Sequence, residues 1–538
     1  MKSSRHRFPL SAGRLLVLCL VGGAQAQVST LPVDEAPPLA RGAAALAPGE
    51  GAGARSWTIT PRIAVDEIWS DNARFSSTDK RSQLTTQLSP GLQVKANGRH
   101  LTGFADYSLL RMIRTGSAVG DETQHNLRSA AKLEAVENRL FVDYSGSITQ
   151  RAISAFGLQT PDASSFNANR TQVKTFQLAP YFVGRLGDWA NYRLRYSLLT
   201  SRSNAPFGSG SNSAFGTSDQ DSREYSGSLS SPQQGSLFNW ALDASRQTSD
   251  FKSGREVDAD QLRGTLGYRV MPELNVVLLP GWESNNYKTT DKESRLTWGV
   301  GADWASERTK ASARLEDRTF GRTYALNLEH RTQRTAWKFS DSKNANVTPT
   351  QLGRAQLGAL YDLLFFQFES IEPDPVRRAL LVESFLLANG LDGRTVVDVG
   401  FSSSGAMLQR RQDVSFSLIG LRDTITLLGT RTNSSSLFNT TTGNGDLANS
   451  AFVRQQSYSL NYARRLSPDT SVNLLVSRLR SQGSQISQST TLKTYNLSFT
   501  TQLGQKTSAT IGLRRTEFDS PTSPYTENSI RGGVAVRF

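Results

Sequence analysis

The chain of 538 residues has one cysteine, four histidines and no long hydrophobic run. A single cysteine excludes a fold held together by disulfide bonds. No apolar stretch approaches the ~18 residues of a membrane-spanning helix, which excludes a helical integral membrane protein. Hydrophobic residues make up only 37%, yet eight Trp, fourteen Tyr and twenty-five Phe are too many aromatic residues for a long disordered chain. The apolar residues must therefore be arranged in another pattern.

The N-terminus has the features of a secretory signal peptide. Four basic residues accompany the start of a short apolar run, Leu15–Val21, and Ala24-Gln25-Ala26 follows as a small-residue cleavage site. We expect residues 1–26 to be removed by cleavage after Ala26. Cys19 lies inside the apolar run after the bulky Leu18, which disfavours lipid attachment. Cleavage would remove the cysteine and four of the 61 basic residues, lowering the net charge from +14 to +10.

Two regions follow the signal peptide. Residues 27–55 are rich in Ala, Pro and Gly, which predicts a flexible lead-in on the periplasmic side. Residues 56–538 show alternation with period two, which is typical of strands with one polar and one apolar face. In the segment 261–270, for example, Leu262, Leu266, Tyr268 and Val270 alternate with polar residues and glycine.

The strand segments are joined alternately by short turns and by longer polar loops. This arrangement is typical of an up-and-down transmembrane β-barrel. Ten short hairpins, a first strand at 57–69 and a last strand at 528–538 predict an all-β antiparallel barrel of about 22 strands. The weaker alternation near 319–340 and 395–412 leaves 18 or 20 strands open.

Three aromatic residues favour a membrane barrel over a soluble β-sandwich or propeller. Trp57 and Trp69 share a face of one strand and are twelve residues apart, or about 28 Å along the membrane normal at the usual rise and tilt. We expect them to belong to two aromatic girdles. Phe538 ends an alternating strand and resembles the C-terminal signal that the bacterial barrel-insertion machinery recognises.

One segment departs from the strand pattern. Apolar residues between 357 and 386 have helical spacing, Asp374-Pro375 resembles a helix start, and Asn389-Gly390 resembles a helix end. This predicts an inserted amphipathic helical hairpin at about 353–392. Two placements remain open, in the lumen as a plug or partner-docking element and on the rim as a packed loop.

No pattern of catalytic or metal-binding residues is evident. His100, His125 and His330 remain after cleavage, and none lies in a setting that singles out a nucleophile or an acidic partner. The run Glu256, Asp258, Asp260 is better explained as solvated charge than as a calcium site, and no Cys/His cluster exists. The basic residues are dispersed rather than clustered, which disfavours nucleic acid. We therefore expect a non-enzyme without cofactor or metal.

The inward-facing residues are the best candidates for function. The alternation assigns a set of basic residues to the lumen, together with acidic residues and many hydroxyl and amide side chains. Such a lumen suits a hydrated, neutral or anionic solute such as a glycan, although any barrel interior must be polar. The basic lumen-facing candidates are Lys95, Arg128, Lys132, Arg193, Arg195, Arg263, Arg269 and Arg314.

Several stretches resemble the outer-membrane β-barrel proteins associated with the PEP-CTERM/exosortase system of Gram-negative bacteria, which are encoded beside exopolysaccharide genes. They are Trp57-Thr58-Ile59-Thr60-Pro61 with Asp71-Asn72, Gln87-Leu88-Ser89-Pro90-Gly91, the run from Gln150 to Gly157, Pro180-Tyr181, the segment 357–390 and Leu408-Gln409-Arg410-Arg411.

The resemblance implies a non-enzymatic role in exopolysaccharide production, export or anchoring in the cell outer membrane. The partners it implies are exopolysaccharide and its export proteins, besides outer-membrane lipids, lipopolysaccharide and the barrel-insertion machinery. The alternative is a general diffusion porin for small hydrophilic solutes.

Overall fold

The computed structural model describes residues 57–116, 119–161, 165, 168–203, 219–232, 237–252, 255–347, 401, 405–438 and 445–538. The expected signal peptide, the lead-in and the helical hairpin at 353–392 lie outside the described residues. The helix α6 (Asp446–Asn449) belongs to the connection between two late strands. None of the helices in the described ranges is long and apolar enough to span a membrane.

The described residues form strands of mostly ten to seventeen residues. In chain order they are β1 (Trp57–Ser70), β2 (Gln83–Asn97), β3 (Leu101–Arg114), β4 (Glu122–Val136), β5 (Leu140–Ala152), β6 (Arg170–Leu186), β7 (Ala190–Ser203), β8 (Gln220–Ser230), β9 (Phe238–Phe251), β10 (Glu256–Met271), β11 (Leu274–Leu278), β12 (Gly281–Asn285), β13 (Glu293–Ala305), β14 (Thr309–Arg318), β15 (Gly321–Arg331), β16 (Thr335–Asn346), β17 (Met407–Ile419), β18 (Asp423–Ser436), β19 (Val453–Arg465), β20 (Thr470–Gln482), β21 (Ser489–Gln502), β22 (Thr507–Asp519) and β23 (Tyr525–Arg537).

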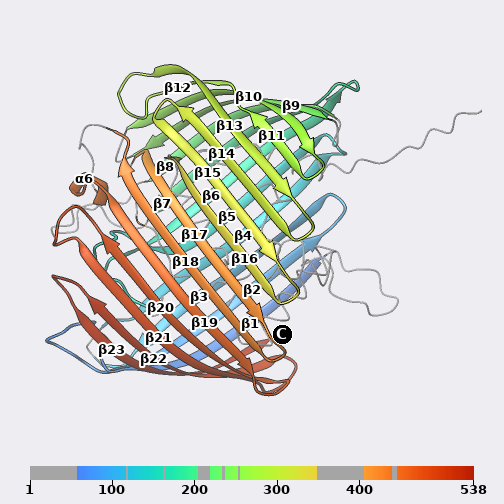
Figure 1. Cartoon of the computed structure of the whole chain (residues 1–538). Coiled ribbons are helices and arrows are strands. Elements are labelled where there is room, and N and C mark those ends of the chain that lie inside the picture. Colours follow the sequence, from blue (N-terminus) through green and yellow to red (C-terminus); the bar gives the residue numbers. More distant parts are fainter. Residues whose placement is uncertain are drawn as a thin grey trace, which may run out of the picture.

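The strands close into one antiparallel ring (Figure 1). Each strand pairs with its neighbours in sequence, and β1 closes the ring by pairing with both β2 and β23. The two short segments β11 and β12 pair with the same two strands, β10 and β13, and together occupy one place. Pro280 lies between them and has no N–H for the ladder, which explains the break. The ring therefore has 22 places, and the prediction of about 22 strands is confirmed.

The connections divide the barrel into two different ends. Short turns join β2 to β3, β4 to β5 and each later hairpin of that series. At the opposite end the connections are mostly longer, such as the one between β5 and β6. The C-terminal end of β23 lies beside the short turn between β21 and β22, since Val536 pairs with Thr507 (Figure 1). We call the two ends the turn end and the loop end.

The two faces of the ring differ in chemistry. Large apolar side chains stay exposed along one face of the strands, and Leu194, Leu266 and Leu513 are examples. The residues between them in sequence are mostly polar and mostly buried or half-buried. An apolar outer surface around a polar interior is typical of transmembrane barrels, and only lipid could cover such a belt at low cost. Trp57 and Trp69 are 53% and 42% exposed at opposite ends of β1.

Aromatic residues gather on the exterior near the turn end. Four ring pairs join side chains close to the short turns there, with centroids between 4.3 and 6.2 Å apart. This is where amphipathic rings meet a membrane–water interface. The pairs are Phe182–Tyr192, Trp189–Trp240, Phe238–Tyr268 and Trp337–Phe416.

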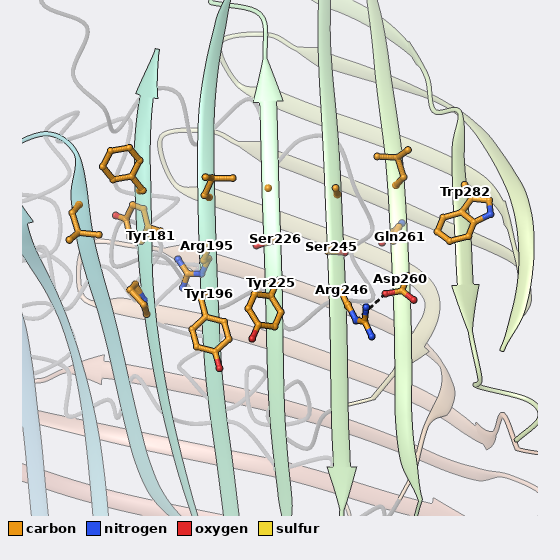
Figure 2. A pocket seen from close by; sticks show the side chains of 17 residues that line it. Tyr181, Arg195, Tyr196, Tyr225, Ser226, Ser245, Arg246, Asp260, Gln261 and Trp282 are labelled. Carbon is orange, nitrogen blue, oxygen red and sulfur yellow. Dashed lines mark ion pairs between the residues drawn. The ribbon is translucent and has the colours of Figure 1, made fainter. Parts of the chain in front are cut away.

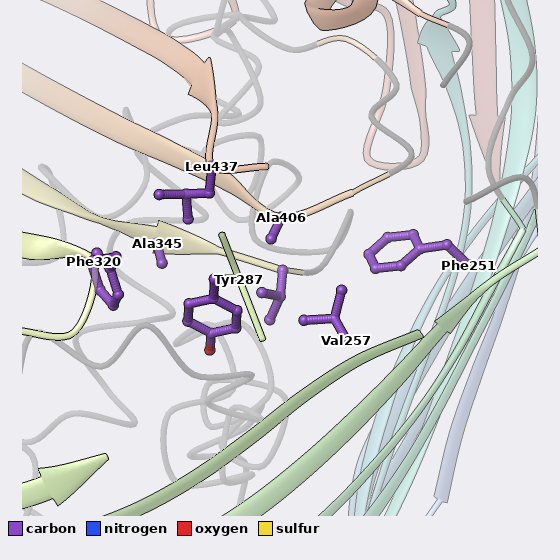
Figure 3. Close-up of a cluster of buried hydrophobic side chains, with 8 residues drawn as sticks. Phe251, Val257, Tyr287, Phe320, Ala345, Ala406 and Leu437 are labelled. Carbon is purple, nitrogen blue, oxygen red and sulfur yellow. The ribbon is translucent and has the colours of Figure 1, made fainter. Parts of the chain in front are cut away.

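The loop end holds compact apolar clusters. One of them brings together the loop-side ends of β9, β10, β16, β17 and β18 with the turns after β12 and β14 (Figure 3). Its buried members are Phe251, Val257, Tyr287, Phe320, Ala345, Val347, Ala406 and Leu437. The segments at the mouth of the barrel are thus packed on one another, so that they present an ordered surface.

Candidate functional site: the lumen and its mouth

All eight basic residues predicted to face the lumen lie on the face opposite the exposed apolar side chains. Lys95, Arg263 and Arg314 are buried, and the other five are half-buried. Their strand neighbours Leu133, Leu194 and Leu262 are exposed on the outer face. The structure does not gather the eight into one site, because they are spread over β2, β4, β7, β10 and β14.

Three of these basic residues meet around an aromatic pair on the inner wall of β4–β7. The rings of Phe141 and Tyr181 stack with centroids 5.2 Å apart. Lys132 lies 5.0 Å above the ring of Phe141, and Arg193 lies 4.2 Å above that of Tyr181. Arg195 donates to Asp143 at 2.7 Å. Cations over ring faces are stabilised by the ring quadrupole, so this patch is a rigid, mixed-charge section of wall.

The inner wall of β10–β14 carries a second set of ion pairs. Arg263 and Glu316 approach to 2.5 Å, as do Arg318 and Glu283, and Arg314 pairs with Asp303. The side chains of the first two pairs are less than a tenth exposed. The first two pairs join strands that are not adjacent, and the third joins the two strands of one hairpin. Together they cross-link this part of the wall. Three of the predicted basic residues, Arg195, Arg263 and Arg314, thus have acidic partners that hold them against the wall.

The wall formed by β18–β21 is different because it carries almost no charge. Its inward-facing residues are hydroxyl and amide side chains with a few aliphatic ones, and Arg465 at the turn end is the one charged residue among the described inward-facing strand positions. Examples are Thr426, Thr430, Gln455, Ser457, Asn461, Asn473, Ser477, Thr494, Asn496 and Ser498. The lumen is therefore two-sided, with paired charges on β5–β14 and a neutral wall on β18–β21. The different composition of these strands is visible in the sequence. Only the closed ring shows that they form two separate walls of the lumen.

The connection between β5 and β6 crosses the mouth of the barrel. Tyr525 on β23 donates to the carbonyl of Gln159 at 2.7 Å, and Thr490 on β21 donates to the carbonyl of Ala155 at 3.5 Å. Going round the ring through β4, β3, β2 and β1, β23 stands five places from β5 and β21 stands seven. The loop must therefore span a chord of the opening. Such a loop narrows the path into the lumen.

A carboxylate latches this crossing loop to the opposite side. Asp446 in α6 accepts hydrogen bonds from the Ser154 hydroxyl and the Ala155 amide, both at 2.6 Å. Asp446 is 1% exposed. Burial raises its pKa to about 6, against the opposing effect of the two hydrogen bonds. The latch therefore contains a group that titrates in a mildly acidic range.

A large groove lies outside the lumen. It has a volume of about 870 Å³ and runs over the outer face of β6–β12, where Tyr225, Leu262 and Trp282 are exposed (Figure 2). The small residues Gly227 and Ala244 are part of its lining. Arg246 and Asp260 form an ion pair of 3.6 Å on its border. Its mainly apolar, lipid-side lining makes it unsuitable for a hydrated solute.

The histidines and acidic runs show no catalytic arrangement in the described residues. The His125 Nδ1 contacts the Tyr107 hydroxyl at 2.8 Å, and the His330 Nδ1 contacts the Thr309 hydroxyl at the same distance. The ammonium of Lys292 lies 2.9 Å from Asp260 and 3.6 Å from Asp258. Within the described ranges, no group of three or more His, Cys, Asp or Glu residues could hold a metal ion.

Comparison with known proteins finds similarity only to solved structures. No protein-family model matches the chain, and no curated protein is similar to it in sequence. The FrpB iron transporter from Neisseria meningitidis is 8% identical, with 89% of this chain and 82% of that chain covered and a TM-score of 0.49. The siderophore receptor PirA from Pseudomonas aeruginosa is 10% identical over 89% and 80%, with a TM-score of 0.43. BauA, the ferric preacinetobactin receptor from Acinetobacter baumannii, is 11% identical over 89% and 80%, with a TM-score of 0.44. At these values the three proteins supply no residue roles for this chain.

Proposed function

We propose that this chain is a non-enzymatic β-barrel of the Gram-negative outer membrane that conducts or anchors a hydrated polysaccharide during exopolysaccharide production. The observation that carries the proposal is the neutral wall of β18–β21. Hydroxyl and amide side chains can exchange hydrogen bonds with a sugar chain in the way water does, so a polymer can bind weakly and still move. The sequence resemblance to the barrels of PEP-CTERM/exosortase systems supports the same cargo.

The opposite wall supports passage rather than tight capture. Several of its cations are paired with carboxylates, as in Arg263–Glu316 and Arg318–Glu283, which reduces the charge that they offer to an anionic polymer. The loop that crosses the mouth and its Asp446 latch would control entry and exit. Exopolysaccharide, its export proteins and the barrel-insertion machinery are the partners that this proposal requires.

A general diffusion porin is the second candidate, and the paired charges favour it as well. Balanced walls discriminate little between small ions, which is what a nonspecific pore requires. The two functions differ in what the neutral wall does, because a porin needs only water there, whereas a polysaccharide conduit needs contact with the polymer.

Planar-bilayer recordings with purified exopolysaccharide from the native strain separate the two candidates. The polymer should block the KCl current in discrete events. Replacing the register pair Asn473 and Ser498 on the neutral wall by alanine should shorten the blocks several-fold and leave the KCl conductance unchanged. The matched control is Ser226→Ala with Ser245→Ala, a register pair on the charged side.

A large, steady conductance that ignores the polymer would refute the polysaccharide role and support the porin. Equal shortening of the current blocks in both double variants would show that the polymer does not bind preferentially to the neutral wall. Deleting the gene should reduce surface polysaccharide without reducing uptake of small solutes, whereas the porin predicts the reverse.

A further inference from the structure

The exterior of β18–β20 carries an arginine patch that consists of Arg431, Arg454, Arg478 and Arg480. Register places these residues on the outer face, since Arg478 pairs with the exposed Tyr458 and Arg431 shares a row with Gln456 and Arg480. Neighbouring strands are about 4.8 Å apart. The four guanidinium groups therefore surround Gln456 on three consecutive strands.

These arginines have no carboxylate partner within ion-pair distance among the described residues. Arg454 stacks on the ring of Phe452, with the guanidinium carbon 5.4 Å from the ring centre. Beyond Asp423, next to a short turn, the outward-facing positions of the three strands include no acidic residue. Other outer-face arginines nearer the loop end do have such partners, as in Arg111–Asp121, Arg202–Asp221 and Arg246–Asp260.

The patch begins part-way along its strands, next to the apolar belt. On β20 the first outward charge, Arg478, comes eight positions after the start of the strand at Thr470. Arg246 is at the same level on β9, eight positions after Phe238, but it is paired with Asp260. Eight residues correspond to about 19 Å along the membrane normal. Arginine facing lipid becomes more destabilising with depth, so cations at this level need an anion beside them.

The lumen does not account for these charges, because the inner face of the same strands is the neutral wall. Arginine presents a planar fork of donors that matches phosphate oxygens, and several arginines together form a typical phosphate site. Tyr458 lies beside Arg478 with its ring exposed, as aromatic residues do at membrane interfaces.

We propose that the arginine patch binds the phosphorylated headgroup of a glycolipid in the outer leaflet of the membrane. The acyl chains would cover the apolar side chains below the patch, such as Leu460 and Val476, while the phosphates meet the guanidinium groups. This binding site depends on the placement of the barrel in the outer membrane and is independent of the cargo in the lumen.

Native mass spectrometry of the full barrel in detergent tests the proposal, with hexa-acylated lipid A carrying two phosphates as the probe. The wild-type protein should retain the lipid. The triple variant R431Q/R478Q/R480Q should retain at least tenfold less, and retention by the wild type should fall as salt is raised. The matched control R111Q/R202Q/R246Q removes three outer-face arginines that have their own carboxylates, and it should retain the lipid as the wild type does.

Two further arms identify the source of the phosphate. Dephosphorylated lipid A should bind at least tenfold more weakly to the wild type, and inorganic pyrophosphate should compete only at far higher concentration than the lipid. Equal retention of the two lipids, or equal retention by the triple variant, would overturn the proposal. Competition by pyrophosphate at the same concentration as the lipid would also overturn it, since the site would then recognise a small anion. A heat-modifiability gel shift checks that each variant is a folded barrel.

Discussion

The ion pair between Asp143 and Arg195 illustrates how single residues stabilise the inner wall. The two side chains are 5% and 9% exposed, and they join β5 to β7 across the intervening β6. Neither residue can easily be solvated if the other is removed, because one oxygen of Asp143 and two nitrogens of Arg195 already lack hydrogen-bond partners. A buried charge left alone in this way is costly.

We expect Asp143→Asn to lower the free energy of unfolding from lipid vesicles by about 3 kcal/mol, measured by urea titration. Adding Arg195→Gln should recover part of the loss, since it removes the uncompensated charge. The control is Glu137→Gln, which breaks the pair with Arg99, where the side chains are 76% and 64% exposed. The Glu137→Gln variant should lose less than about 1 kcal/mol of its free energy of unfolding. Equal losses in the two single variants would contradict this account.

The face on which a single residue lies could be predicted from the sequence, but its interaction partner could not. Alternation placed Arg195 and Arg263 on the inner face, because the side-chain period of a strand is two. It did not identify their partners, since Asp143 and Glu316 come from strands two or more places away and their meeting depends on the register of several hairpins. The outward-facing arginines at 478 and 480 were equally visible in the sequence, yet their isolation from acids emerges only when three strands are aligned.

Among the elements, hairpins were the most predictable. The two-ended pattern of short turns and long loops is local, so it could be recognised without knowledge of the ring. Pro280 is also visible in the sequence, but it divides one strand into β11 and β12 without changing the register on either side. The loop from β5 to β6 was unpredictable, because its partners are on β21, β23 and α6. It includes the Ile153–Gly157 part of the motif on which the family resemblance rests.

The latch of this crossing loop should respond to pH. The pKa of Asp446 is about 6 in the docked loop against an ordinary value of 3.8, so the docked state favours the protonated carboxyl. The free energy that protonated Asp446 contributes to docking of the loop is fully present below about pH 4 and is lost as the pH rises through about 6. We expect the single-channel conductance to increase between pH 4 and pH 7. The variant Asp446→Asn should keep the low conductance at both values, and an unchanged pH response in this variant would exclude Asp446 as its source.

At the scale of the whole molecule, the two walls predict how the lumen selects ions. Several cations of β5–β14 are held by carboxylates, and β18–β21 add almost no charge, so we expect neither sign to dominate the path. A KCl gradient across a planar bilayer should therefore give a reversal potential close to zero.

Glu316→Gln removes the partner of Arg263 and leaves its charge uncompensated on the inner wall, which should shift the reversal potential toward that of chloride. The control Glu517→Gln removes a carboxylate from the outer face and should leave the potential unchanged. A strong selectivity in the wild type, or the same shift in both variants, would mean that charges other than the paired inner-wall residues determine the field in the lumen.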